Sequence, residues 1–165
     1  MTQTYPDIAV FDLDYTIWPT YADTNISPPI SYDEKNKHLV DTYGYTVSLF
    51  PDVIRIFEDL QKHDVTIVTA SRTWAPEIAA DMVAKFGLNK YIKGSEWGER
   101  SKKGHIKDLL KKLGYKNGDG LKIVLFDDEG RNKEVRTMGV DFVYLDSSHG
   151  VTWKDYQDYL NGKVK

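Results

Sequence analysis

Three short apolar runs, separated by stretches of helical periodicity, constrain the fold of this chain most strongly. The runs cover residues 7–11, 65–70 and 121–126. Continuous apolar runs of this length are typical of strands that are buried on both faces, as in parallel sheets. The helices expected between them would cover both faces of that sheet. The alternation therefore predicts an α/β fold, a three-layer sandwich with a mostly parallel sheet.

Local patterns predict the other elements. Residues 51–62 carry apolar side chains on one helical face, with Pro51 suited to the first turn. A second helix is predicted between Pro76 and Gly87, and a third ends at Gly114. The remaining predicted elements are a short strand near residues 91–92, a helix ending at Gly139, a strand over 141–145, and a helix from Thr152 that opens with a capping box to Asp155.

Composition and charge limit the possible functions. The 165 residues are enough for one domain, predicted to span 1–165. A net charge of −3 gives no general attraction to nucleic acid or anionic membranes, so neither is expected as a partner. The absence of cysteine excludes disulfides and thiolate metal sites. No secretion signal is recognisable at the N-terminus, so the cytoplasm is the expected location, with the nucleus as an alternative.

Residues 20–50 are rich in proline and tyrosine and have weak periodicity. Within them, DTYGYTVSLF (41–50) predicts a hairpin with Gly44 near its turn. We expect this segment to form a short flap, and to be the only part of the chain that borders the pocket at the strand ends described next. The intervals between the polar clusters described next are too short for an inserted cap domain. The tyrosines available to the flap are Tyr21, Tyr32, Tyr43 and Tyr45.

Polar side chains follow three of the predicted strands. Asp12 and Asp14 follow the first strand, Ser71 and Arg72 the second, and Asp127 the run LKIVLF. Ligands of parallel α/β sheets bind outside the carboxyl ends of the strands, where these residues lie. Two carboxylates 4 Å apart repel by ~4 kcal/mol at an effective dielectric constant near 20. A cation is the simplest way to offset that repulsion.

Each cluster also has a purely structural explanation. Paired acids after a strand are common in turns and helix caps, and Ser71 could cap the next helix. The acids after LKIVLF could stabilise a helix dipole. Lys102 belongs to a basic run, and such runs are usually solvated helix faces. The structural explanations do not account for all four motifs occurring in one order at strand ends.

The motifs FDLDYTIWP, TASRT, SKKGH and FDDEGRN together resemble those of the haloacid dehalogenase superfamily. They are most similar to the signature of the eukaryotic magnesium-dependent phosphatase family. The resemblance implies a Rossmann-like fold of the haloacid dehalogenase type without a cap domain. It also implies Mg²⁺ as cofactor and a phosphorylated small molecule or phosphoprotein as substrate, such as a phosphotyrosine-like or sugar-phosphate monoester.

The resemblance assigns a role to each motif residue. Asp12 would be the nucleophile that forms an aspartyl-phosphate, and Asp14 the general acid and base. The implied magnesium ligands are Asp12, the backbone carbonyl of Asp14, and Asp128. Substrate contacts are expected from Ser71, Arg72 and Lys102, and supporting positions from Asp127, Glu129 and Asn132.

Two other functions stay open at this point. Receiver domains also combine acids, a phosphorylated aspartate, a hydroxyl residue and a lysine, but their lysine comes last, whereas Lys102 precedes the final acid pair. Phosphomutases and other phosphotransferases share the four motifs but usually carry a sizeable cap. The sequence leaves His105 undecided between a pocket position and the surface.

Overall fold

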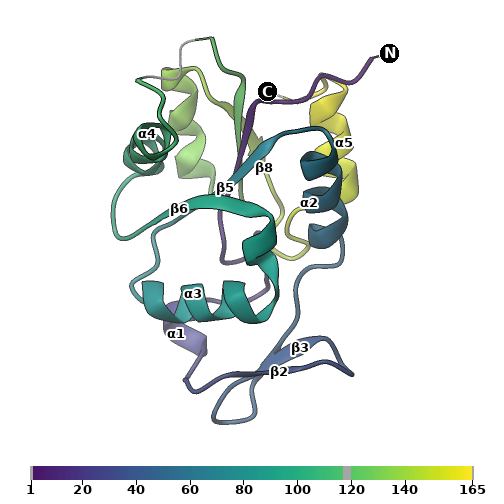
Figure 1. The fold of residues 1–165 in the computed structure, drawn as a ribbon, viewed down its shortest axis with the longest axis vertical. Helices are drawn as coiled ribbons and strands as arrows, with labels where there is room; N and C mark the ends of the chain where they lie inside the picture. Colours follow the sequence, from purple (N-terminus) through teal and green to yellow (C-terminus); the bar gives the residue numbers. More distant parts are fainter. Residues whose placement is uncertain (1, 117–119, 165) are drawn as a thin grey trace.

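Five parallel strands form the central sheet of the computed structural model, which describes residues 2–116 and 120–164 (Figure 1). Their spatial order is β6-β5-β1-β7-β8. The strands are β1 (Ile8–Phe11), β5 (Thr66–Ser71), β6 (Ile92–Trp97), β7 (Ile123–Asp127) and β8 (Asp141–Tyr144). All four neighbouring pairs of this sheet are parallel, so the predicted α/β fold is confirmed.

The strand order decides between two of the sequence-based alternatives. Counted along the chain, the sheet strands lie in the order 3-2-1-4-5, which is that of the Rossmann fold. Receiver domains have the order 2-1-3-4-5, so the receiver alternative is wrong. The direction of winding reverses between β1 and β7, and ligands of such sheets bind at the carboxyl ends flanking that point.

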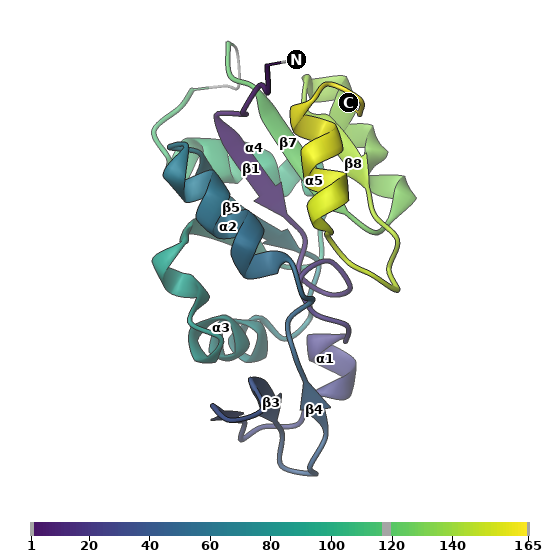
Figure 2. The ribbon, with the colours of Figure 1, turned by 90° about the vertical axis from the view of Figure 1, so that its right-hand side faces the viewer.

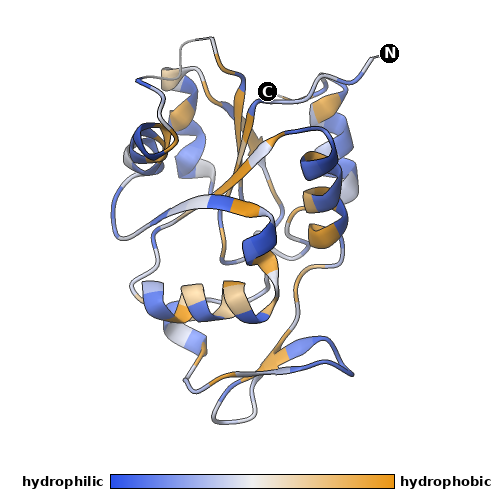
Figure 3. Cartoon of the chain, in the orientation of Figure 1, coloured by the Kyte–Doolittle hydropathy of each residue, from blue (hydrophilic) through white to orange (hydrophobic). Residues whose placement is uncertain are grey.

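Helices cover both faces of the sheet, as the continuous apolar runs predict. The helices are α2 (Val53–Lys62), α3 (Pro76–Lys85), α4 (Lys102–Lys112) and α5 (Trp153–Leu160), with the 3₁₀ helices η1 (Leu88–Lys90) and η2 (Gly130–Met138). Alternate residues of β1 enter two separate cores. Ala9 and Phe11 pack in the core shared with α2, α3 and α5, and Ile8 and Val10 pack in the core shared with α4 and η2. Strands β1, β5 and β7 are accordingly among the most continuously apolar parts of the chain (Figure 3).

Several predicted boundaries shift. Pro51 precedes α2, which begins at Val53, instead of lying in its first turn. The strand expected near 91–92 continues to Trp97, because its pairing with β5 extends through polar residues that carry no strand signal. The helix ending at Gly139 is a 3₁₀ helix. The capping box of Thr152 and Asp155 is confirmed.

Residues 20–50 form more than a hairpin. They contain the short helix α1 (Ala22–Asn25) and a three-stranded antiparallel sheet, β2 (Ser31–Asp33), β3 (His38–Val40) and β4 (Thr46–Val47). The predicted hairpin is its β3–β4 part, with Gly44 at φ 83° in the turn. The carboxylate of Asp41 holds this segment by accepting three backbone N–H groups, from Ser27, Tyr43 and Tyr45.

The small sheet lies beyond α1 and α3, at the end of the molecule opposite the two termini (Figure 2). Among the described residues, the small sheet and α1 are the only elements between β1 and α2. They are too small to form a cap domain, so the prediction that the chain has no inserted cap is confirmed. None of the helices in the described part of the chain is long and apolar enough to cross a membrane.

Candidate active site

A buried ammonium group lies at the centre of the site. Nζ of Lys102 is 2.9 Å from Oδ1 of Asp12 and 2.8 Å from Oδ2 of Asp127. Lys102 begins α4, whereas Asp12 directly follows β1 and Asp127 is the last residue of β7, the two strands at the reversal of winding. Burial alone would lower the pKa of Lys102, but the two carboxylates outweigh it and raise that pKa. The lysine therefore carries a fixed positive charge beside Asp12.

Each carboxylate oxygen of Asp12 accepts a hydrogen bond from a different donor. Oδ1 accepts from Lys102, and Oδ2 accepts from the buried hydroxyl of Thr16 at 3.1 Å. Burial, with a smaller contribution from the carboxyl of Asp128, raises the pKa of Asp12 to about 6 against the attraction of Lys102. The carboxylate is thus oriented by its neighbours and kept away from bulk water.

Asp14 is two residues beyond Asp12 in the loop after β1 and lines the same pocket. Its Oδ1 accepts from the indole Nε1 of Trp18 at 2.8 Å and from the backbone N of Ala22 at 3.0 Å. Burial raises its pKa to about 6, although both hydrogen bonds act in the opposite direction. Tyr15, between Asp14 and Thr16, has φ 60°, a left-handed conformation that is uncommon for an aromatic residue. A carboxyl with such a pKa can donate and accept a proton near neutral pH.

Three carboxylates gather at the ends of β1 and β7. Asp12, Asp127 and Asp128 each offer an oxygen, and these atoms lie within 4.8 Å of one another. Asp127 is already occupied, because its oxygens accept from Lys102, from Nδ2 of Asn132 and from the backbone N of Glu129. Burial and the neighbouring Asp12 raise its pKa to about 6. Asp12 and Asp128 therefore have the more available oxygens for a cation.

The end of β5 supplies the opposite wall of the pocket. Ser71 is buried, and its Oγ accepts from the backbone N of Thr73 at 3.2 Å, which leaves its hydroxyl hydrogen for another partner. Arg72 donates from Nη2 to Oδ1 of Asn132 at 2.6 Å. Its Nε is buried and has no hydrogen-bond partner among the described residues. The wall thus offers hydrogen-bond donors that could meet an anion.

Of the predicted site residues, a pocket of about 180 Å³ is lined by Asp12, Asp14, Ser71, Arg72, Lys102 and Glu129, whereas Asp128 lines a separate cavity. The prediction that only residues 20–50 border it is wrong. That segment contributes Tyr21 and Asp23, but Trp74, Glu129 and Arg131 also line the rim. The β5–α3 loop reaches the rim because the backbone N of Trp74 donates to Asp23 at 3.1 Å. Of the four flap tyrosines, Tyr21 alone lines this pocket, because Tyr32 lines a groove beside Phe86 and the hydroxyl of Tyr45 bonds Thr20.

Thr16 and Trp18 orient the two motif aspartates, and the sequence assigned neither of them to the site. Both follow Asp14 closely in the sequence, so a hydroxyl and an indole donor just after a carboxylate pair are the sequence signal that could have identified them. His105 lies inside the protein: its Nε2 is 3.0 Å from the carbonyl oxygen of Gly98. Burial lowers its pKa to about 4, so the neutral imidazole supports the loop before Lys102.

The comparisons with known proteins agree with this geometry. The family model described as acid phosphatase matches residues 4–164. A Saccharomyces cerevisiae protein named as a candidate magnesium-dependent phosphatase is 47% identical, over 97% of this chain and 98% of its own length. The human magnesium-dependent phosphatase 1 is 35% identical, over 85% of this chain and 78% of its own length.

A Schizosaccharomyces pombe protein named as a member of the haloacid dehalogenase-like hydrolase superfamily is 33% identical, over 84% of this chain and 85% of its own length. The chain belongs to the magnesium-dependent phosphatase family of the haloacid dehalogenase superfamily. Solved structures agree on the fold. A haloacid dehalogenase-superfamily hydrolase from Ehrlichia chaffeensis superposes with a TM-score of 0.65 at 12% identity, over 99% of this chain and 98% of that one. The family predicted from the four motifs is therefore confirmed.

Proposed function

We propose that this family member is a magnesium-dependent phosphatase that hydrolyses phosphate monoesters through a phosphorylated Asp12. One observation carries the proposal. The carboxylate of Asp12 is aligned by Lys102 and Thr16 at the floor of a pocket that also holds Asp14 and Ser71. A nucleophile, an acid and donors for phosphoryl oxygens are thus within one small space.

The residues present fit a magnesium ion. Mg²⁺ prefers oxygen ligands, usually one or two carboxylates together with water and substrate phosphate. The available oxygens of Asp12 and Asp128 match that preference, and the carbonyl of Asp14 is proposed as a third protein ligand. When bound, the metal would neutralise charge on the substrate phosphate. Asp127 would remain on Lys102 and Asn132, in a supporting position.

The protein groups would act in sequence. An oxygen of Asp12 attacks phosphorus, and Asp14, protonated, donates its proton to the leaving oxygen. Asp14 then takes a proton from the water that cleaves the acyl phosphate, which regenerates Asp12. Ser71 and Arg72 hold phosphoryl oxygens, and Lys102 offsets the charge that develops beside Asp12. Asn132 holds Arg72 and Asp127 in position by bonding both, and Glu129 holds Arg131 at the rim.

Metal removal tests the proposal directly. Hydrolysis of 4-nitrophenyl phosphate by the purified chain should fall at least about 100-fold in excess EDTA and return with Mg²⁺, because metal assistance supplies several kcal/mol. Calcium should inhibit, since its longer and more variable coordination would misplace Asp12. Full turnover in EDTA would refute the metal assignment. Phosphate passed to an added sugar phosphate, with none released to water, would identify a phosphotransferase instead.

The acid and base role of Asp14 predicts a dependence on the leaving group. Asp14→Asn should slow hydrolysis of alkyl phosphates by about 10³-fold or more. With 4-nitrophenyl phosphate, whose leaving group needs little protonation, a burst of nitrophenolate should precede slow turnover. Asp64→Asn, at an exposed aspartate outside the pocket, is the control and should keep normal kinetics. Wild-type turnover of alkyl phosphates by Asp14→Asn would exclude the assignment.

The open rim predicts that bulky substrates reach Asp12. A phosphotyrosyl peptide should be hydrolysed with a kcat/KM close to that of free phosphotyrosine, because the small sheet of residues 31–47 contributes no side chain to the pocket. Trp74→Ala should lower kcat/KM for aryl phosphates about 3–10-fold, the worth of one aromatic contact. Tyr43→Ala, at an exposed residue outside the pocket, should change nothing. A several-hundredfold loss for the peptide would instead indicate a closing flap and a small-metabolite substrate.

A further inference from the structure

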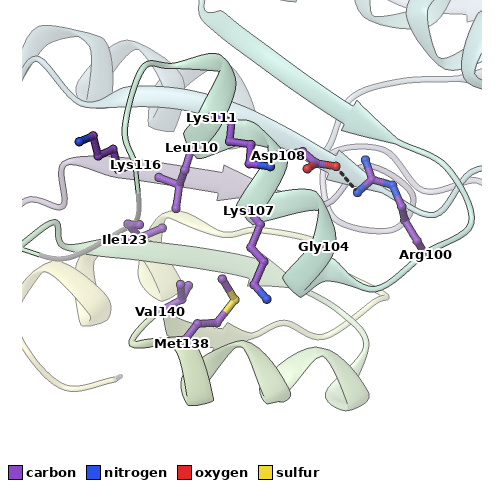
Figure 4. A pocket seen from close by; sticks show the side chains of 10 residues that line it. All are labelled: Arg100, Gly104, Lys107, Asp108, Leu110, Lys111, Lys116, Ile123, Met138 and Val140. Atoms are coloured by element: carbon purple, nitrogen blue, oxygen red, sulfur yellow. Dashed lines mark hydrogen bonds and ion pairs between the residues drawn. The ribbon is translucent and has the colours of Figure 1, made fainter.

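A second cavity, of about 480 Å³, lies between α4 and η2 (Figure 4). It shares no lining residue with the pocket around Asp12. Ile123, in its wall, is the first residue of β7, whereas Asp12 and Asp128 directly follow the last residues of β1 and β7. The cavity therefore lies towards the amino ends of the strands, away from the reaction.

The floor of this cavity is apolar. Leu110, Ile123 and Val140 are buried, and Met138 is partly buried beside them. Their side chains converge from α4, the sheet and the end of η2 (Figure 4). Volumes of about 300–1,000 Å³ with mostly apolar walls are usual for sites that bind small molecules.

The rim of the cavity is basic. Lys107 and Lys111 are exposed one turn apart on α4, on either side of Leu110, and Lys116 lies across from them. None of these three lysines forms an ion pair with another residue in the described part of the chain. Among the described lining residues the one acid is Asp108, which pairs with Arg100 at 2.6 Å. Within the described residues, three lysines without an ion-pair partner thus border an apolar floor, in a chain whose net charge is −3.

We propose that this cavity is a second, non-catalytic binding site for a small amphipathic anion. Its occupant has an aromatic or short aliphatic body on Leu110 and Met138, and a carboxylate, sulfate or phosphate group at Lys107 and Lys111. Apolar burial and charge complementarity act on the two ends of the same molecule. Lysine ammonium groups are point charges, so the site selects an anionic group without requiring one particular geometry.

Binding of 8-anilino-1-naphthalenesulfonate, an aryl sulfonate, tests this assignment. Its fluorescence should rise on titration with the native chain, and 4-phenylbutyrate should displace it whereas inorganic phosphate should not. Lys107→Glu/Lys111→Glu should weaken binding at least tenfold. Met138→Trp, which fills the cavity without changing charge, should do the same. Hydrolysis of 4-nitrophenyl phosphate should be unchanged in both variants, which separates this result from the proposed catalytic function.

The matched control changes the net charge equally at exposed lysines elsewhere. Lys35→Glu/Lys62→Glu should bind the probe within twofold of the wild type. An equal loss of probe binding in both double variants would mean that only the overall charge matters, and would overturn the proposed site. Absence of binding to the wild type would overturn it as well. Binding of an acidic peptide such as hexaglutamate, without binding of the aryl sulfonate, would show a protein partner in place of a small anion.

Discussion

Asp12→Asn is expected to abolish phosphatase turnover, with a loss of at least about 10⁴-fold, while the protein stays folded. An amide is a poor nucleophile and cannot form the acyl phosphate, and removing a nucleophile from comparable enzymes costs about that much or more. The substitution keeps the shape of the side chain, and Lys102 keeps its contact with Asp127 at 2.8 Å. Thermal melting should therefore change little.

The intermediate itself gives the sharper measurement. Acid-quenched wild-type enzyme should retain phosphate from a radiolabelled substrate in a form that hydroxylamine releases, and Asp12→Asn should retain none. Asp64→Asn is the matched control, because Asp64 is exposed and its φ of 59° suits asparagine equally well. Turnover of Asp12→Asn within tenfold of the wild type would contradict the assignment.

Much of the site could be predicted because it depends on topology. Asp12, Ser71 and Asp128 follow strands that must be parallel, so their proximity follows from the rule for carboxyl ends of such strands. Lys102 could be placed there only through the family motif, since its sequence surroundings look like a solvated basic face. In the structure Lys102 is buried because its ammonium group pairs with Asp12 and Asp127 at the carboxyl ends of β1 and β7.

Contacts that depend on tertiary packing could not be predicted. Nothing in the sequence states that the indole of Trp18 turns back onto Asp14, or that Trp74 reaches the rim through Asp23. Strand β2 is three largely polar residues, and its pairing comes from the loop that Asp41 ties together. From the sequence, His105 could equally be a polar surface residue, and only the fold buries its imidazole against the carbonyl oxygen of Gly98.

Lys102→Met is expected to damage both activity and stability. The change keeps the length of the side chain but leaves Asp12 and Asp127 as neighbouring buried carboxylates without their shared cation. Removing one partner of a buried ion pair costs about 3–5 kcal/mol in the free energy of unfolding. The loss of a charge-stabilising donor should also lower kcat by about 10²–10³-fold. Both effects should be absent from Lys103→Met, the neighbouring lysine of α4.

The pH dependence of the stability loss follows from the carboxylates. Burial already raises the pKa of Asp12 and Asp127 to about 6, and loss of the ammonium group should raise both further. The folded variant then binds more protons than the unfolded chain above the usual pKa of 3.8, so its stability should fall as pH rises from 5 to 8. Denaturant unfolding without metal, repeated across that range, measures the effect.

A double variant separates charge burial from catalysis. Adding Asp127→Asn to Lys102→Met removes one of the two opposed carboxylates, and should recover a large part of the lost stability at pH 7. It should not recover activity, because the cation beside Asp12 is still missing. Recovery of both quantities would mean that Lys102 acts only by holding the fold together. Recovery of neither would mean that repulsion between the two carboxylates is not the source of the instability.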